Sequence, residues 1–179
     1  MFDPRIRAVA DVLVNYSIAL QPGQLVQIQA KADSEPLIVE LYRSILRAGG
    51  HPWVDLGIEA TEEVFFLHAS DDQLDYYPDF RKRADEEIAA SITIWSDANT
   101  KRLSLVDAAK QSRRAKAMHP YISRFFERMA SGDVRWVGTA FPTHAAAQTA
   151  EMSLRAFEGF VYGACLVEEE DPIAAWKAV

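Results

Sequence analysis

Four histidines and one cysteine are the side chains best suited to hold a transition metal, and their spacing forms no metal-binding motif. Zinc sites need several closely spaced His, Cys or carboxylate ligands, such as an H-E-x-x-H sequence or two paired cysteines. Only His68 has carboxylates near it, at Asp71, Asp72 and Asp75. This cluster either binds a cation or forms the first turn of a helix, where acidic side chains are favoured. We favour the helix turn.

Nucleophilic and nucleotide-binding patterns are also missing from the sequence. Cys165 lies in the apolar segment 162–166, and burial suppresses thiol reactivity, so we expect a core residue. No serine lies in a G-x-S-x-G turn. The strand-to-helix loops at 31–35 and 96–100 contain no glycine, whereas a phosphate cradle needs glycines that let backbone N–H groups approach.

The stretch 101–116 is the one basic concentration in the chain. It either forms a surface for an anionic partner or is the solvated face of a helix, which is the usual role of such a run. Few aromatic residues interleave with the cations, so a stacking platform for single-stranded nucleic acid is not expected. The cations are Lys101, Arg102, Lys110, Arg113, Arg114 and Lys116.

The elements that must position these residues alternate between helix and strand. Asp3-Pro4 starts a helix as a cap followed by proline at the first helical position. The order favours parallel pairing through crossover helices. We predict an α/β fold with a mainly parallel central sheet of about four or more strands, helices on both faces and a C-terminal helical extension. The expected domain covers 1–150 and the helical extension 151–179. The expected strands begin near Leu25, His51, Ile88 and Val134. Long helical patterns cover 34–48 and 104–130. We expect the second of these helices to be broken or bent near Pro120 and to point four apolar side chains inward, those of Ile122, Phe125, Phe126 and Met129.

Composition excludes several classes of function. The formal net charge of −7 disfavours general binding to phosphate backbones, so no nucleic-acid partner is expected. No segment approaches the roughly 20 apolar residues that span a bilayer, and the first residues do not resemble a signal peptide. The single cysteine cannot form an internal disulfide, which fits a cytoplasmic protein.

Several ordered segments resemble one family. The chain is similar to the aminopeptidase T and AmpS-type metallopeptidases over nearly its whole length, and the order of the segments is more specific than any one of them. The matching segments are Asn15-Tyr16-Ser17, Leu20-Gln21-Pro22-Gly23-Gln24, Glu40-Leu41-Tyr42-Arg43, Arg47-Ala48-Gly49-Gly50-His51-Pro52, Gln73-Leu74 before Pro78, Asn99-Thr100 with Leu103, Arg135-Trp136-Val137-Gly138-Thr139, Phe141-Pro142-Thr143, Ala147-Gln148, Ala150-Glu151-Met152-Ser153-Leu154, Phe157-Glu158 and Phe160-Val161-Tyr162.

The resemblance implies a metallo-aminopeptidase of about twice this length, in which a second domain holds two divalent metal ions such as zinc or cobalt. One metal would polarise the scissile carbonyl, a bridging water would attack, and a carboxylate would carry the proton to the leaving amine. No catalytic or metal-binding residue of the family falls on this chain, which we expect to be inactive alone.

By this resemblance the chain is an N-terminal domain that walls and gates the substrate cavity, packs on a catalytic domain and belongs to a homodimer acting on peptides. Loops at the carboxyl ends of strands usually form the clefts of open α/β sheets. Asn99, Thr100, Pro142 and Thr143 are therefore expected at the cavity or the domain interface, although all four are also ordinary turn residues. The alternative function is a stand-alone binding module that uses the basic stretch 101–116.

Overall fold

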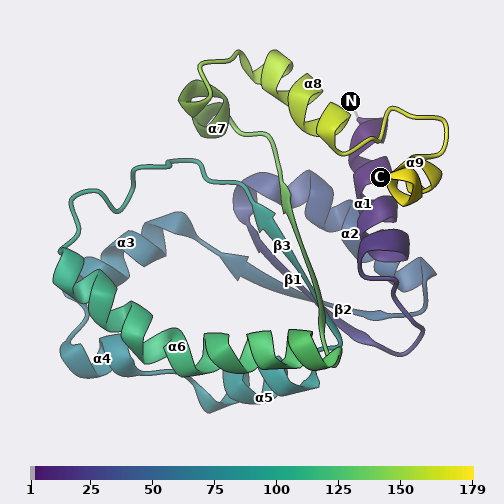
Figure 1. The fold of residues 1–179 in the computed structure, drawn as a ribbon. Coiled ribbons are helices and arrows are strands. Elements are labelled where there is room, and N and C mark those ends of the chain that lie inside the picture. The colour runs from purple at the N-terminus through teal and green to yellow at the C-terminus, as the bar shows by residue number, and fades with distance from the viewer. Residues whose placement is uncertain (1–2) are drawn as a thin grey trace.

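The computed structural model describes residues 3–179 and contains a four-stranded parallel sheet in the order β2-β1-β3-β4 (Figure 1). Helices cover both faces of the sheet, and further helices follow the last strand, so the predicted fold class is confirmed. The strands are β1 Leu25–Lys31, β2 His51–Gly57, β3 Ala90–Trp95 and β4 Arg135–Ala140. The helices are α1 Pro4–Val12, α2 Glu35–Arg47, α3 Glu59–His68, α4 Asp71–Asp75, α5 Asp79–Glu87, α6 Ala108–Ser131, α7 His144–Thr149, α8 Leu154–Ala164 and α9 Pro172–Ala178, with a π-helical turn at Leu13–Ser17 after α1 and a 3-10 turn at Ala32–Ser34 before α2.

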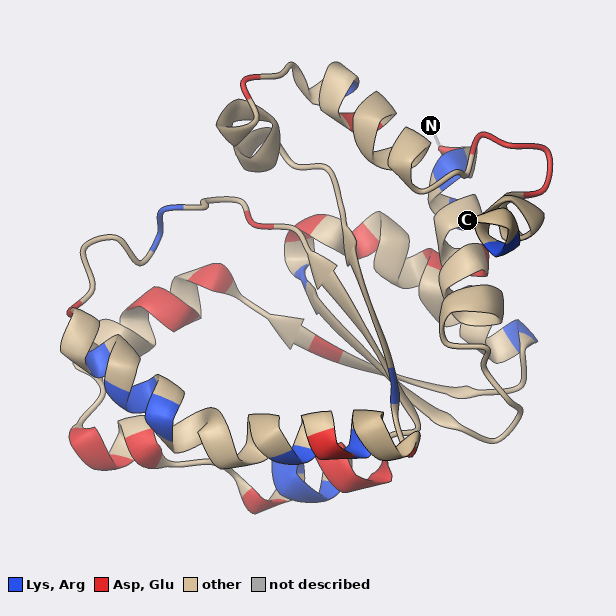
Figure 2. Ribbon diagram, in the orientation of Figure 1, with Lys and Arg blue, Asp and Glu red and all other residues tan. Residues whose placement is uncertain are grey.

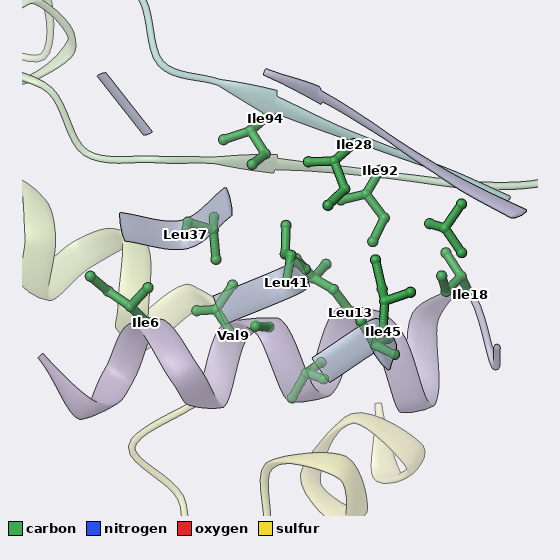
Figure 3. Packing of buried hydrophobic residues seen from close by; sticks show 14 of the residues in the cluster. Ile6, Val9, Leu13, Ile18, Ile28, Leu37, Leu41, Ile45, Ile92 and Ile94 are labelled. Atoms are coloured by element: carbon green, nitrogen blue, oxygen red, sulfur yellow. The ribbon is translucent and has the colours of Figure 1, made fainter. Parts of the chain in front are cut away.

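One face of the sheet carries the hydrophobic core. Strand side chains such as Ile28 and Ile92 point toward α1 and α2 and are fully buried (Figure 3). In α2, Leu37, Leu41 and Ile45 recur at helical spacing and fill the same layer. Asp3 caps α1 as predicted, because its carboxylate accepts the backbone N–H of Arg5 at 2.9 Å.

The opposite face of the sheet is polar. Gln27 donates to Asp55 at 3.1 Å and accepts a hydrogen bond from Ser91 at 3.1 Å, so one chain of bonds crosses β2, β1 and β3. The guanidinium of Arg81 in α5 makes a two-pronged contact with Asp55. Paired in this way, the buried polar groups avoid the cost of an unsatisfied donor or acceptor. This network fastens α5 to the sheet without an apolar interface.

Helix α6 differs from the predicted helix at 104–130. It begins at Ala108, where the Asp107 carboxylate caps the first turn by accepting the Ala109 N–H at 2.8 Å, and it continues through Pro120 without a break. Ile122 and Phe126, predicted to point inward, are more than half exposed. A cavity of about 290 Å³ lies between α6 and a sheet face that is mainly polar at Gln27, Gln29, Ser91 and Thr93, with Trp136 as its aromatic member, so little apolar surface is available to bury them.

No helix within residues 3–179 combines the length and the apolar character that crossing a bilayer requires.

Truncating a side chain on the buried face of α2 should lower the free energy of unfolding much more than truncating one on its exposed face. We expect Leu41→Ala to lower the free energy of unfolding by about 2–5 kcal/mol, because Leu41 is fully buried and the vacated space cannot collapse completely. Leu46→Ala on the exposed side of the same helix should change it by less than about 0.5 kcal/mol. Urea denaturation followed by circular dichroism measures both, and equal effects would contradict the packing described here.

Candidate functional site at the carboxyl ends of the strands

The loops that follow the parallel strands gather at one edge of the sheet. Strand β1 ends at Lys31, β3 ends at Trp95 and β4 ends at Ala140. Because the strands are parallel, their carboxyl ends meet on the same side, which is where open α/β sheets form ligand clefts. The side chains on these loops therefore define the candidate site.

A five-residue ion network fixes this edge. The Lys31 ammonium contacts Asp97 directly and lies 3.1 Å from Glu59 Oε1. The Arg102 guanidinium lies 2.7 Å from Asp97 Oδ1 and 2.8 Å from Glu62 Oε2. Three carboxylates thus share two cations in a partly buried setting, which we call the strand-end network. Its members come from β1, α3 and the loop after β3, so the network joins three parts of the chain.

The charges of the network shift the ionisation of its members. Burial raises the pKa of the Asp97 carboxyl, but the hydrogen bond from Lys31 and the positive charges of Lys31 and Arg102 outweigh burial and lower the pKa below its usual value. Burial lowers the pKa of the Arg102 guanidinium, and the bond to Glu62 and the charge of Asp97 raise it overall. Both shifts favour the charged forms of Asp97 and Arg102.

The four residues expected at this site lie on the loops that the network holds. The Asn99 N–H donates to Glu59 Oε2 at 3.2 Å, and Thr100 Oγ1 lies 3.4 Å from Thr149 Oγ1 in α7. Thr143 Oγ1 donates to the carbonyl of Asp97 at 2.8 Å, which joins the loop after β4 to the loop after β3. Pro142 is buried beside it. The structure thus brings Asn99 and Thr143 into one bonded assembly, while their role toward substrate stays a prediction.

An open pocket of about 640 Å³ lies beside the network, between α3 and the end of β1. Lys31, Glu59 and Glu62 form its charged rim, and Phe65 and Phe66 form its apolar wall. Its size is in the range of small-molecule sites. Lys31, Glu59 and Glu62 on this rim are each paired within the chain. These side chains therefore serve to shape a cleft wall and do not offer the unpaired groups that a catalytic centre needs.

The donor set within residues 3–179 does not fit a pair of divalent metals. No group of three or more His, Cys, Asp or Glu side chains in this part of the chain comes together in a metal-binding arrangement. Asp71 and Asp75, the carboxylates near His68, are both bound by the Arg113 guanidinium. Ser70 and Gln73 form a reciprocal cap at the start of α4, which agrees with the interpretation of this cluster as a helix turn.

The basic stretch 101–116 is largely engaged inside the molecule. In Figure 2, the blue bands in the first half of α6 lie beside the red segments of α4, where Arg113 pairs with Asp71 and Asp75. The Lys110 ammonium donates to the carbonyls of Phe66 and Ala69, and the Arg114 guanidinium donates to the carbonyls of Leu74 and Tyr76. The alternative of a free anion-binding surface is therefore not supported, because these cations fasten α6 to its neighbours.

Sequence reasoning missed the strand-end network. Lys31 and Asp97 lie at the ends of two predicted strands whose order in the sheet could not be predicted, and Glu59 and Glu62 belong to a separate helix. The opposite charges of Lys31 and Asp97 at two strand ends were the one usable signal. The contribution of Arg102 could not be foreseen, because its loop conformation depends on tertiary contacts.

The chain is an α/β domain built on a four-stranded parallel sheet, and comparison with known proteins names the family. The sequence profile of the family described as "Thermophilic metalloprotease (M29)" matches residues 2–179. The chain belongs to this family, which confirms the resemblance seen in the sequence.

Two relatives show how much of the family architecture the chain covers. It is 25% identical over 178 residues to Aminopeptidase 2 from Geobacillus stearothermophilus, which covers 94% of this chain and 43% of the relative. Its fold matches that of wild-type AmpT from Thermus thermophilus with a TM-score of 0.78 at 21% identity, covering 99% of this chain and 46% of the other. The chain thus spans less than half the length of these relatives.

Loss of the central carboxylate should weaken the strand-end network in a pH-dependent way. We expect Asp97→Asn to lower the free energy of unfolding by about 1 kcal/mol at pH 7, because Lys31 and Arg102 both lose a partly exposed counterion. The folded-state pKa of Asp97 is lowered, so the contribution is fully present above the ordinary value of 3.8 and is lost as pH falls below it. Denaturation series from pH 7 down to acid conditions measure this.

The matched control is Glu169→Gln, because Glu169 is exposed and has no ion-pair partner among residues 3–179. Its stability difference from the parent should be near zero at every pH. A difference between the Asp97→Asn variant and the parent that persists unchanged in acid would contradict the assigned charge state.

Proposed function

We propose that this chain is the N-terminal, non-metal-binding part of a metal-dependent aminopeptidase that removes N-terminal residues from peptides. The observation that carries the proposal is the family match over residues 2–179 combined with coverage of less than half of the relatives. The donor set of residues 3–179, which lacks a metal-binding cluster, agrees with metal ligands located in the remaining part of a family-length protein.

We further propose that the strand-end edge walls and gates the substrate cavity, with Asn99, Thr100, Pro142 and Thr143 facing the cavity or the adjoining domain. The strand-end network supports this role, because it holds two loops rigidly at the position where α/β sheets form clefts. A wall that excludes bulky substrates must resist deformation, and ion pairs that are partly buried and joined by hydrogen bonds provide that resistance. In this arrangement residues 1–150 form the wall and 151–179 lead toward the catalytic part.

The face of the molecule formed by α5 and α6 supports contact with further protein. Ile122 and Phe126 of α6 are each more than half exposed and line the same cavity, and Phe80 of α5 is also more than half exposed. Exposed apolar side chains that gather on one face mark interaction surfaces in soluble proteins. We propose that this face is covered in the assembled enzyme, by the catalytic part or by a second subunit of a homodimer.

A paired assay tests the proposed division of labour. We expect the isolated 179-residue chain to release no p-nitroaniline from leucine p-nitroanilide and to bind no stoichiometric zinc or cobalt by calorimetry. Aminopeptidase 2 from Geobacillus stearothermophilus, assayed in parallel, should cleave the substrate and lose roughly a hundredfold or more of its rate after chelation, because the activated water and the Lewis acid are lost together. Stoichiometric metal binding with hydrolysis by the isolated chain would refute the proposal.

A further inference from the structure

Strand β4 is an edge strand with one unpaired side. It pairs only with β3, and the N–H groups of Arg135 and Phe141 donate to the carbonyls of Ala89 and Trp95 at 3.0 and 2.9 Å. Successive peptide groups of a strand point to opposite sides, so the residues between these positions alternate in direction. The peptide groups that point away from β3, and that find no hydrogen-bond partner among residues 3–179, belong to Trp136, Gly138 and Ala140.

This free edge lies in an apolar groove of about 580 Å³. Residues 137–140 of β4 form its floor. Leu13 after α1, Phe160 in α8 and Trp176 in α9 form one wall, and Trp95 at the end of β3 forms the other. No charged side chain lines the groove. A volume of this size accommodates a short run of extended polypeptide rather than a folded element.

The absence of a side chain at Gly138 shapes the groove. A Cβ atom placed on Gly138 would lie 2.4 Å from Cη2 of Trp95, so the Trp95 ring occupies the space above this residue. The Trp95 and Trp136 rings meet edge to face with their centroids 6.3 Å apart, which fixes the Trp95 ring beside the strand edge. The close approach of the ring to the backbone at Gly138 gives the groove an aromatic wall.

We propose that the groove beside β4 binds an extended peptide as a fifth strand of the sheet. The outward peptide groups of β4 would pair with the peptide backbone, and alternate apolar side chains of the peptide would enter the groove. This inference rests on the proposed function insofar as that function makes peptides the molecules handled by the family-length enzyme. It assigns a peptide-binding surface to the edge of the sheet formed by β4.

The shape of the groove favours a single strand over a second copy of the chain. Edge-to-edge pairing of two copies would bring two recessed edges together, each flanked by its own α8 and α9. The two sets of walls would meet before the edges could bond. A lone extended peptide carries no such walls and reaches the floor of the groove.

Charge around the groove favours a positively charged peptide. Val167 lines the groove, and the acidic run 168–171 leads from it to α9, whose Trp176 also lines the groove. Residues 168–179 carry four carboxylates and one lysine. One of these carboxylates, Glu168, is neutralised by Arg5 at 3.5 Å, and the others are exposed. A positively charged peptide is therefore attracted to this rim.

The test is fluorescence anisotropy of the 179-residue chain with a fluorescein-labelled octapeptide of alternating lysine and valine. We expect saturable binding, and the same peptide with N-methylated backbone amides at alternate residues should lose it, because it cannot complete the strand hydrogen bonds. An octapeptide of alternating glutamate and valine should bind at least about threefold more weakly, because it carries the charge of the rim.

Two variants, each with a matched control, locate the binding site on the chain. Ala164→Trp, on an exposed position that lines the groove, should fill the space and weaken binding by about tenfold or more. Ala156→Trp, on an exposed position of the same helix outside the groove, is the matched control and should leave affinity unchanged. Ala140→Pro removes one outward N–H and keeps the bonds to β3, so it should weaken binding roughly three- to tenfold, whereas Ala140→Ser keeps the N–H and the affinity.

Three results would overturn the proposal that the groove binds a peptide. Absence of binding up to millimolar peptide, or binding that Ala164→Trp leaves unchanged, would overturn the inference. So would a dimer in sedimentation that Ala140→Pro dissociates while the peptide has no effect, because the occupant would then be a second copy. The measurement needs no hydrolysis, so its failure would leave the aminopeptidase assignment intact, and failure of that assignment would leave the binding result readable.

Discussion

The structure depends on the burial of one face of the parallel sheet against α1 and α2. Side chains from β1 and β3, including Ile28 and Ile92, meet Leu41 and Ile45 with almost no exposed surface. Burial of a large aliphatic side chain contributes about 1.5–3 kcal/mol, so this layer supplies the dominant stabilising term of the domain. Because this single layer holds the strands in place, the opposite face and the strand ends need not be apolar.

The rest of the molecule uses charge where an α/β protein more often uses apolar packing. Arg81 joins α5 to the sheet through Asp55, and Arg113 joins α6 to α4 through Asp71 and Asp75. The strand-end network performs the same task for the loops after β1 and β3. Ion pairs between exposed groups are individually weak, so the attachment of α6 through Arg113 is easier to separate than the core, whereas the strand-end network is partly buried. The molecule therefore combines one rigid layer with helices that are held mainly by polar contacts.

Much of the fold could be predicted from the sequence, because the apolar strand at 88–95 and the amphipathic α2 follow simple periodicities. Two elements could not. Helix α3 begins at Glu59 without a side-chain cap, so no capping residue marks its start in the sequence. The apolar stripe of α6 pointed to burial, yet Phe126 lies exposed because the sheet offers it a polar face.

The candidate site could likewise be predicted only in part from the sequence. The loops carrying Asn99 and Thr143 were placed correctly at one edge, because parallel strands require it, whereas pairing among Lys31, Asp97 and Arg102 depends on three-dimensional proximity. The basic stretch looked like a free surface because sequence alone does not reveal that Lys110 and Arg114 find carbonyl partners on α3 and α4.

The chain of hydrogen bonds that crosses the sheet from Asp55 through Gln27 to Ser91 also acts as a check on strand alignment. A slip of β1 by one residue would turn the side chains of Gln27 and Gln29 into the hydrophobic core and move Val26 and Ile28 to the polar face of the sheet. Each misaligned amide would then be stranded without a partner at a cost of about 1–3 kcal/mol. Mispaired sheets are thereby penalised twice during folding, and only the native alignment satisfies both faces together.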